Sequence, residues 1–157
     1  NVALALDTGV AGLSVEDRTG QVLYEQRRAV DRIKAAREAI GRSGHDVVLV
    51  GRSEGYLIGR TELAETIDRL VAYAEAGADC LYAPGITDLS SIRTLVSAVA
   101  PKPVNVLLIG PNMRVADLAD AGVRRVSVGG SLAAAAWGAF DRAVRLLIDE
   151  GRLPKRE

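Results

Sequence analysis

The chain has 157 residues, of which 48% are hydrophobic and 25% are charged, and its twenty basic residues balance its twenty acidic ones. This composition is typical of a globular domain, and a net charge of zero gives no overall field to attract nucleic acid or an anionic membrane. No apolar run is long enough to cross a bilayer, and the single cysteine cannot form an internal disulfide. We therefore expect a cytoplasmic protein with no nucleic-acid or membrane partner.

One local pattern occurs three times along the chain. In residues 5–15, 74–83 and 119–128, small residues at the end of a helix lead to a glycine, and a short apolar run follows. Glycine just past a helix is a common terminator because it adopts positive φ without a side-chain clash. The apolar run after each glycine predicts a buried parallel strand. Two further strands are predicted within 46–51 and 103–109.

Helical periodicity fills the intervals between these strands. A residue spacing of three to four between apolar positions predicts helices at the following ranges: 29–40, 61–73, 89–99, 115–121 and 131–150. For the helix at 61–73 we expect Leu63, Ile67, Leu70 and Ala74 to form the apolar stripe. Strict alternation of helix and strand predicts a parallel sheet with covering helices and right-handed crossovers.

An open doubly wound sheet and part of a barrel both fit five such strands. A complete barrel has eight strands and about 250 residues. The uniform helix–glycine–strand unit, and a first segment that reads as the end of a helix, favour part of a barrel. No Gly-x-Gly-x-x-Gly follows any strand, which weakens the dinucleotide-binding alternative. We expect a single α/β domain over 1–157, whose final helix, 131–150, contacts a neighbouring subunit.

Polar and charged residues follow several of the predicted strands. After strands come Glu16-Asp17-Arg18, Arg52-Ser53-Glu54 and Gly129-Gly130-Ser131, and Asn105 lies within the strand predicted at 103–109. The carboxyl ends of parallel strands meet at one edge, where the active sites of such folds lie. Carboxylates beside an arginine and an amide suit a divalent cation and an anionic substrate. A solvated rim of salt bridges is the simpler alternative, and the glycines before Ser131 also permit a phosphate site.

The same segments resemble a known family in their order along the chain. Residues 9–17 resemble the fourth strand of the isocitrate lyase/phosphoenolpyruvate mutase family, and Gly51-Arg52-Ser53-Glu54 is similar to its Ala-Arg-Thr-Asp motif on the fifth strand. Residues 73–79, 102–107 and 122–130 are similar to later family segments. The resemblance implies strands four to eight of a (β/α)8 TIM barrel, with strands one to three absent from this sequence.

The resemblance also implies a chemistry and a set of site residues. Family members are Mg²⁺-dependent enzymes, with Mn²⁺ as a possible substitute, that make or break C–C or P–C bonds in small oxo or hydroxy carboxylic acids. By resemblance, Glu16 helps to hold the metal and Arg52 contacts the substrate carboxylate or the developing oxyanion. Asn105 lies near the substrate, and Glu54 is a catalytic-site residue that orients its neighbours. A homodimer or homotetramer is expected, since the family's last helix commonly packs on a neighbouring subunit.

Departures from the family pattern narrow the expected activity. The segment 18–24 has neither the cysteine loop of the isocitrate lyases nor the lysine-containing lid of the phosphonate-forming mutases, and Pro84 stands where others have His or Glu. A broader oxo-acid lyase or an oxaloacetate-type decarboxylase is therefore favoured. A phosphonomutase and a non-catalytic assembly fragment remain alternatives. Without the metal carboxylates of strand three, we expect the chain as given to be inactive.

Overall fold

The computed structural model describes residues 1–155, and these form two compact units. The first unit is Asn1–Ser127 and the second is Val128–Glu157, of which residues 128–155 are described. The first unit contains every strand and five of the six α-helices, whereas the second contains the last helix. We describe each unit by itself, because the functional residues predicted from the sequence all lie in the first.

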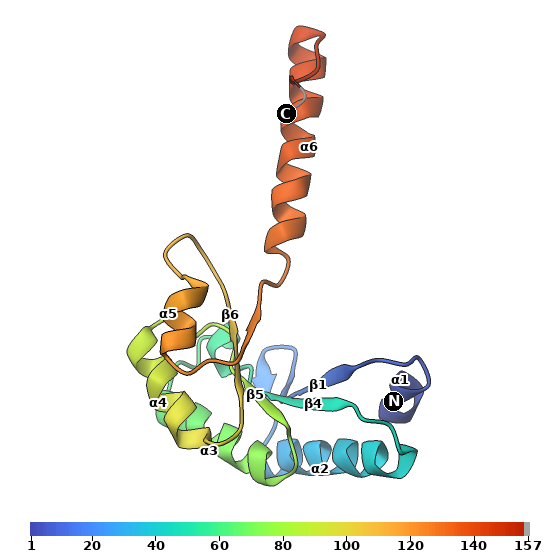
Figure 1. Cartoon of the computed structure of the whole chain (residues 1–157), viewed down its shortest axis with the longest axis vertical. Coiled ribbons are helices and arrows are strands. Elements are labelled where there is room, and N and C mark those ends of the chain that lie inside the picture. Colours follow the sequence, from blue (N-terminus) through green and yellow to red (C-terminus); the bar gives the residue numbers. More distant parts are fainter. Residues whose placement is uncertain (156–157) are drawn as a thin grey trace. The chain divides into compact units, whose positions relative to one another are not determined.

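Figure 1 shows the order of the elements along the chain. The strands are β1 (Gly12–Glu16), β2 (Arg18–Thr19), β3 (Val22–Leu23), β4 (Val48–Arg52), β5 (Cys80–Tyr82), β6 (Val104–Leu107) and β7 (Arg125–Ser127). The helices are α1 (Val2–Leu6), α2 (Gln26–Ser43), α3 (Leu63–Glu75), α4 (Leu89–Val99), α5 (Val115–Asp120) and α6 (Ser131–Glu150), and η1 (Gly55–Ile58) is a single 3₁₀ turn.

The predicted parallel sheet is confirmed. Its five strands follow the order β1-β4-β5-β6-β7, and each is parallel to the next. Neighbouring strands are also successive along the chain when the short β2–β3 pair is set aside, which is the arrangement of consecutive barrel strands. The glycine terminators behave as predicted: Gly9, Gly77 and Gly122 have φ of +74°, +104° and +89°.

One element was not anticipated from the sequence. Directly after β1, the strands β2 and β3 form a small antiparallel hairpin, in which Arg18 pairs with Leu23 and Thr19 with Val22. The two residues between them are Gly20 and Gln21, and Gly20 has φ +57°. Two-residue strands are too short to give an alternating sequence signal, so the segment reads as a loop.

The strands separate two apolar layers because their side chains alternate between the faces of the sheet. On one face, Leu49, Leu81 and Val106 belong to the main core, which they share with buried residues of the helices such as Ile33 and Leu70. On the other face, Val50, Cys80 and Tyr82 form a second, smaller cluster with Leu107. The helices α2 and α3 lie along the first face, as Figure 1 shows. The second face carries the polar side chains described below.

The buried side of α3 differs from the predicted stripe. Leu70 is fully buried, but Leu63, Ile67 and Ala74 are only partly buried at the edge of the core. The deepest positions of the helix also include Thr66, Arg69 and Tyr73. An apolar-stripe argument misses all three of these because it assigns charged and polar residues to solvent. Here Arg69 and Tyr73 are buried because they have hydrogen-bond partners beneath the helix.

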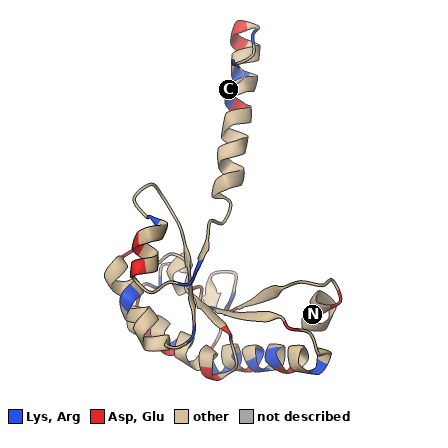
Figure 2. Ribbon diagram, in the orientation of Figure 1, with Lys and Arg blue, Asp and Glu red and all other residues tan. Residues whose placement is uncertain are grey.

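The charged residues are mixed along most of the first unit (Figure 2). Helix α2 is the exception, since basic residues recur along it, and two of them stack on one ring. The guanidiniums of Arg28 and Arg32 lie 4.4 and 5.0 Å from the centroid of Tyr24. Such cation–π contacts shield the ring at the base of the β2–β3 hairpin.

The second unit consists mainly of α6, a helix of 20 residues with none of them buried. Its large apolar residues are exposed, among them Leu132, Trp137, Phe140 and Ile148. The rings of Trp137 and Phe140 pack edge to face with centroids 5.8 Å apart. Within the described part of the chain, no helix combines the length and apolarity that crossing a membrane requires.

Candidate active site at the carboxyl ends of the strands

Strand register brings the predicted site residues into one row. Glu16 on β1 is the partner of Arg52 on β4, and Arg52 is in turn the partner of Tyr82 on β5. Tyr82 is the partner of Asn105 on β6. Residues that are in register on parallel strands present their side chains on the same face of the sheet. The row Glu16–Arg52–Tyr82–Asn105 therefore runs across four strands, at the carboxyl ends of β1, β4 and β5 and within β6.

Arg52 stands at the centre of the charged part of this row. Its Nε donates to Oε1 of Glu54, and its Nη1 lies 3.3 Å from Oε1 of Glu16. The guanidinium also lies 5.0 Å from the centroid of the Tyr82 ring. The side chain is nevertheless 24% exposed, so part of the guanidinium remains accessible from solvent. Arg52 is thus oriented by three groups and still open to an anion.

Glu54 is fully buried, and each of its carboxylate oxygens has an arginine. Oε1 accepts from Arg52, and Oε2 accepts from Nε of Arg18 at 2.7 Å. Arg18 also donates to the carbonyl of Gly20 at 2.9 Å, which ties the β2–β3 hairpin to the same carboxylate. A buried carboxylate held between two guanidiniums is suited to orienting them, in line with the role expected from the sequence.

A second buried carboxylate lies beneath Glu54. Asp17 is 2% exposed, and its Oδ1 accepts the backbone N–H of Glu54 at 2.8 Å. Its Oδ2 accepts the hydroxyl of Tyr73 at 2.7 Å and lies 3.5 Å from Nη1 of Arg69. Arg69 donates onward to the carbonyl of Tyr24 at 3.1 Å. Burial, followed by the charge of Asp17, raises the pKa of the Tyr73 hydroxyl well above its ordinary value, so this hydroxyl stays a donor.

The close approach of α3 to β4 makes this contact possible. A Cβ placed on Gly51 would lie 2.9 Å from the Cβ of Tyr73 and 3.1 Å from the Cβ of Ala78. Both distances are shorter than side chains accept without displacement. Glycine at position 51 therefore allows Tyr73 to reach Asp17, and it directly precedes Arg52 in the sequence.

The uncharged end of the row involves Asn105, Ser127 and Tyr82. Nδ2 of Asn105 donates to Oγ of Ser127 at 3.0 Å, and this hydroxyl donates to the Tyr82 hydroxyl oxygen at 3.4 Å. Oδ1 of Asn105 and Oγ of Ser53 are buried and have no hydrogen-bond partner among residues 1–155. A buried acceptor without a donor costs about 1–3 kcal/mol, and such atoms are typical of ligand sites.

The described residues offer only part of a metal site. Glu16 could supply one oxygen, since its side chain is 44% exposed. The neighbouring carboxylates Asp17 and Glu54 already accept hydrogen bonds, Asp17 from Glu54 and Tyr73, and Glu54 from Arg18 and Arg52. Within residues 1–155, no three His, Cys, Asp or Glu side chains lie close enough together to hold a metal ion. Because Mg²⁺ can bind through one or two carboxylates together with water and substrate, Glu16 fits as one ligand among several.

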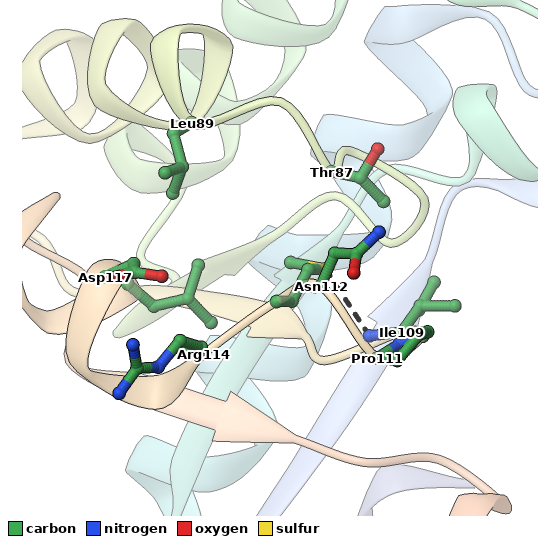
Figure 3. Close-up of a pocket in the computed structure, with 10 residues that line it drawn as sticks. Thr87, Leu89, Ile109, Pro111, Asn112, Arg114 and Asp117 are labelled. Atoms are coloured by element: carbon green, nitrogen blue, oxygen red, sulfur yellow. Dashed lines mark hydrogen bonds between the residues drawn. The ribbon is translucent and has the colours of Figure 1, made fainter.

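A separate cavity of about 400 Å³ lies beside the loop that follows β6. Figure 3 shows its lining, in which Ile109, Pro111 and Asn112 come from that loop and Arg114 and Asp117 from α5 and its start. The amide of Ile109 donates to the Met113 sulfur at 3.5 Å, drawn as a dashed line. None of the residues predicted from the sequence to act in catalysis or binding lines this cavity. The register row and its buried acceptor are the stronger indication of a reactive site.

Cys80 illustrates a residue whose chemistry is structural. It is 3% exposed, and burial raises the pKa of its thiol. A raised pKa keeps the thiol protonated at neutral pH, and a protonated thiol is a poor nucleophile. Cys80 instead packs with Val50 and Tyr82 in the smaller cluster, on the second face of the sheet.

Several residues of the site were missed by sequence reasoning. Tyr82 looks like an ordinary apolar strand residue until its register with Arg52 is known. Ser127 is likewise part of the row only through its hydrogen bond to Asn105. Asp17 stands beside Glu16 in the sequence with no role assigned to it, and Tyr73 and Arg69 are not part of the apolar stripe predicted for their helix. The signal for them is the buried polar pair on α3, which requires a partner under the helix.

Comparisons with known proteins give the fold and the site a family context. The family profile described as phosphoenolpyruvate phosphomutase matches residues 1–148. A solved protein of Burkholderia cenocepacia J2315, provisionally assigned as a lyase/mutase, is 46% identical with a TM-score of 0.92, over 97% of this chain and 56% of that one.

Two further relatives have named activities. An oxaloacetate decarboxylase of Rhodopseudomonas palustris (strain BisB5) is 31% identical over 94% of this chain and 52% of its own length. A 2,3-dimethylmalate lyase, described as a member of the PEP mutase/isocitrate lyase superfamily, is 26% identical with a TM-score of 0.86, over 99% of this chain and 57% of the other.

The chain spans about half the length of the curated relatives that it matches, 54% for the first of them. Over that span the five parallel strands and their helices agree with part of the TIM-barrel fold of the structural neighbours. The agreement extends over the profile match and includes relatives above 30% identity. The chain belongs to the isocitrate lyase/phosphoenolpyruvate mutase family.

Proposed function

We propose that the natural polypeptide carrying this sequence is a lyase that cleaves a C–C bond in a small α-oxo or hydroxy carboxylic acid, or decarboxylates it, through an enolate-type intermediate. The observation that carries the proposal is the row Glu16–Arg52–Tyr82–Asn105, in which a partly exposed guanidinium and a buried, unpartnered amide oxygen stand at either side of one tyrosine. Such a row recognises a small anion that also carries a hydrogen-bond donor.

Arg52 is the residue that we assign to the negative charge of the substrate. Breaking a C–C bond next to a carbonyl leaves an electron pair that is delocalised onto the carbonyl oxygen as an enolate. A guanidinium already oriented by Glu54 and Tyr82 stabilises that charge without having to reorganise during the reaction. Glu54 acts through Arg52 in this proposal, because both of its oxygens already accept from arginines.

Asn105 is assigned to orienting the substrate. Its Nδ2 is engaged with Ser127, so its remaining capacity is the acceptor Oδ1. A substrate hydroxyl would supply the missing donor, and an oxo acid would do so through a bound water.

The proposal includes Mg²⁺, with Mn²⁺ as a substitute, and Glu16 as one of its ligands. When bound, the ion would supply positive charge to the developing enolate oxygen. Glu16 would then exchange its contact with Arg52 for the metal, and that exchange would leave more of the guanidinium open to the substrate.

Oxaloacetate is the substrate that we would test first. One relative is an oxaloacetate decarboxylase that is 31% identical over 94% of this chain. In a decarboxylation the bond between the β-carboxylate and the adjacent carbon breaks, carbon dioxide leaves, and the electron pair forms the enolate of pyruvate. Protonation of that enolate completes the reaction, and no oxidant or reductant is required.

A phosphonomutase is the second candidate, favoured by the name of the matching family profile. It would act on a P–C bond in place of a C–C bond. A non-catalytic role in assembly is the third candidate, since the chain covers only about half of its relatives.

We also propose a homodimer or homotetramer, supported by the exposed apolar residues of α6, and light scattering of the purified protein measures this state.

The test is turnover by the natural polypeptide with Mg²⁺, with pyruvate release measured on oxaloacetate and phosphorus NMR measured on phosphonopyruvate. We expect pyruvate release that falls by about 100-fold in Arg52→Lys, because an ammonium cannot keep both the Glu54 contact and the substrate contact. Arg42→Lys is the matched control, since Arg42 is an exposed arginine of α2 paired only with Glu38.

The outcomes separate the three candidates. Conversion of phosphonopyruvate without pyruvate release favours the mutase, and saturable substrate binding without turnover favours the non-catalytic role. An equal loss in Arg52→Lys and Arg42→Lys would remove the basis for assigning the site to Arg52.

A further inference from the structure

Asp17 follows β1 and Glu54 follows β4, and of these two carboxylates only Glu54 contacts Arg18 and Arg52. Glu54 contacts Arg18 and Arg52, whereas Asp17 contacts the backbone of Glu54. Asp17 makes no ion pair with either of those arginines; its ion pair is with Arg69 of α3. Asp17 therefore acts on Arg18 and Arg52 indirectly, through the peptide N–H of Glu54.

From this geometry we infer that Asp17 is a positioning residue of the site. Its buried carboxylate fixes the backbone at Glu54, and the Glu54 side chain in turn orients the guanidiniums of Arg18 and Arg52. Glu54 lies two residues beyond Arg52, just past the end of β4, where the sheet no longer holds the chain. Ser53 is still bound by the sheet neighbour, since its N–H donates to the carbonyl of Tyr82 at 2.8 Å. The N–H of Glu54 is the next donor along, and Asp17 is its acceptor.

Asp17 is itself held from two sides, which gives it the rigidity that positioning requires. From α3 come the hydroxyl of Tyr73 and the guanidinium of Arg69, and both side chains are buried. On the other side, the Asp17 carbonyl, between β1 and β2, accepts the N–H of Tyr24 at 2.7 Å, which closes the hairpin that carries Arg18. The carboxylate of Asp17 therefore has three donors, from Glu54, Tyr73 and Arg69, and these fix its position between α3 and the backbone of Glu54.

The chain contains a matched control at the opposite end of the same strand. Asp79 accepts the N–H of Leu49 at 2.8 Å and pairs with Arg37, so it too joins a carboxylate to a β4 amide and an arginine. Arg37 donates its Nε to the carbonyl of Gly77 at 2.8 Å, and none of these groups belongs to the register row. Asp17→Asn and Asp79→Asn therefore make the same chemical change at two carboxylates that each accept a backbone N–H and pair with an arginine, the first 2% and the second 42% exposed.

The experiment is the arginine Nε–Hε region of a ¹⁵N-correlated NMR spectrum, recorded on the chain without any ligand. The signals of Arg18, Arg52 and Arg37 are assigned by single Arg→Lys variants. In Asp17→Asn we expect the Arg52 and Arg18 signals to move and their hydrogens to exchange faster with water, while the Arg37 signal stays in place. In Asp79→Asn we expect the reverse. A fold that merely loosens would move all three signals in both variants.

Unmoved Arg52 and Arg18 signals in a folded Asp17→Asn variant would overturn the inference. If Asp17→Asn does not fold, Tyr73→Phe replaces it, because it removes one donor to Asp17 and keeps every charge. That variant is expected to shift the same two signals by a smaller amount, and the absence of such a shift would also overturn the inference.

This inference rests on the proposed function only for its effect on turnover. In the natural polypeptide, Asp17→Asn should lower kcat/KM on oxaloacetate by about tenfold, chiefly through KM, and Asp79→Asn should leave it within about twofold. Shifted arginine signals in a protein whose wild type has no turnover would sink the proposed function and leave the role of Asp17 intact. Turnover by the wild type with unshifted arginine signals in Asp17→Asn would support the proposed function and overturn the role of Asp17.

Discussion

At both ends of β4 an aspartate accepts a backbone N–H and pairs with an arginine, but the side chains around the two aspartates differ. At the amino end, Asp79 accepts the N–H of Leu49 and pairs with Arg37, whose Nε is bonded to a backbone carbonyl. At the carboxyl end, Asp17 accepts the N–H of Glu54, and the next layer of side chains consists of a carboxylate and two partly exposed arginines. At the amino end the arginine is bound by a backbone carbonyl and by Asp79, whereas at the carboxyl end a fully buried carboxylate holds two arginines.

This difference shows how a repeated fold can separate stability from chemistry. In barrel-type folds the carboxyl ends of the strands carry the active site and the amino ends stabilise. The two buried side-chain atoms without a partner among residues 1–155 belong to Ser53, just past β4, and to Asn105, which is part of the row.

The largest effect is expected from filling the space that lets α3 approach β4. Gly51→Ala should destabilise the fold by about 1–3 kcal/mol, because its Cβ would lie 2.9 Å from the Cβ of Tyr73. Gly41→Ala is the control: Gly41 is an exposed residue of α2 with nothing within 4 Å of the added atom, and its substitution should stabilise by about 0.5–1 kcal/mol. Urea unfolding measures both. Equal, small effects would mean that Tyr73 reaches Asp17 without needing the glycine.

A smaller effect is expected from the hydroxyl of Tyr73. Tyr73→Phe removes a buried hydrogen bond of 2.7 Å to Asp17 and should cost about 0.5–1.5 kcal/mol near neutral pH. Burial and the charge of Asp17 raise the pKa of Tyr73 above its ordinary value of 10.0. Above about pH 10 the unfolded chain releases this proton and the folded chain retains it, so the stability of the wild type falls as the pH rises.

The variant lacks this contribution to the alkaline loss. The difference in unfolding free energy between wild type and Tyr73→Phe should therefore shrink between about pH 8 and about pH 11. A difference that stays constant over this range would show that Tyr73 titrates alike in the folded and unfolded chain, and that it is not held by Asp17.

Much of the fold follows from the sequence because its signals are local. The glycines at 9, 77 and 122 end helices at positive φ, and the apolar runs after them are the strands β1, β5 and β7. Helices α4 and α6 have the bounds that periodicity predicts. The β2–β3 hairpin is too short to leave such a signal, and it is specified by contacts such as Arg18 to Glu54, 36 residues away.

The site was predictable only as a set of strand ends. Adjacency of Arg52 and Glu16 follows from parallel pairing, but the place of Tyr82 between Arg52 and Asn105 depends on register, which spacing alone does not fix. The layer under the rim was hidden for a different reason. Arg69 and Tyr73 interrupt an apolar stripe, and only a buried acceptor such as Asp17 explains why they face inward.

The most direct test of the account is a titration of the chain with oxalate, the smallest dicarboxylate, followed in the arginine Nε–Hε signals. The account predicts that the Arg52 signal shifts and saturates, because its guanidinium is partly exposed and already oriented by Glu54 and Tyr82. The Arg37 signal should not respond, because Arg37 is bound by the carbonyl of Gly77 and by Asp79. Equal shifts of both signals, or no shift of Arg52 at millimolar oxalate, would contradict the claim that the carboxyl ends of these strands form an anion-binding active site.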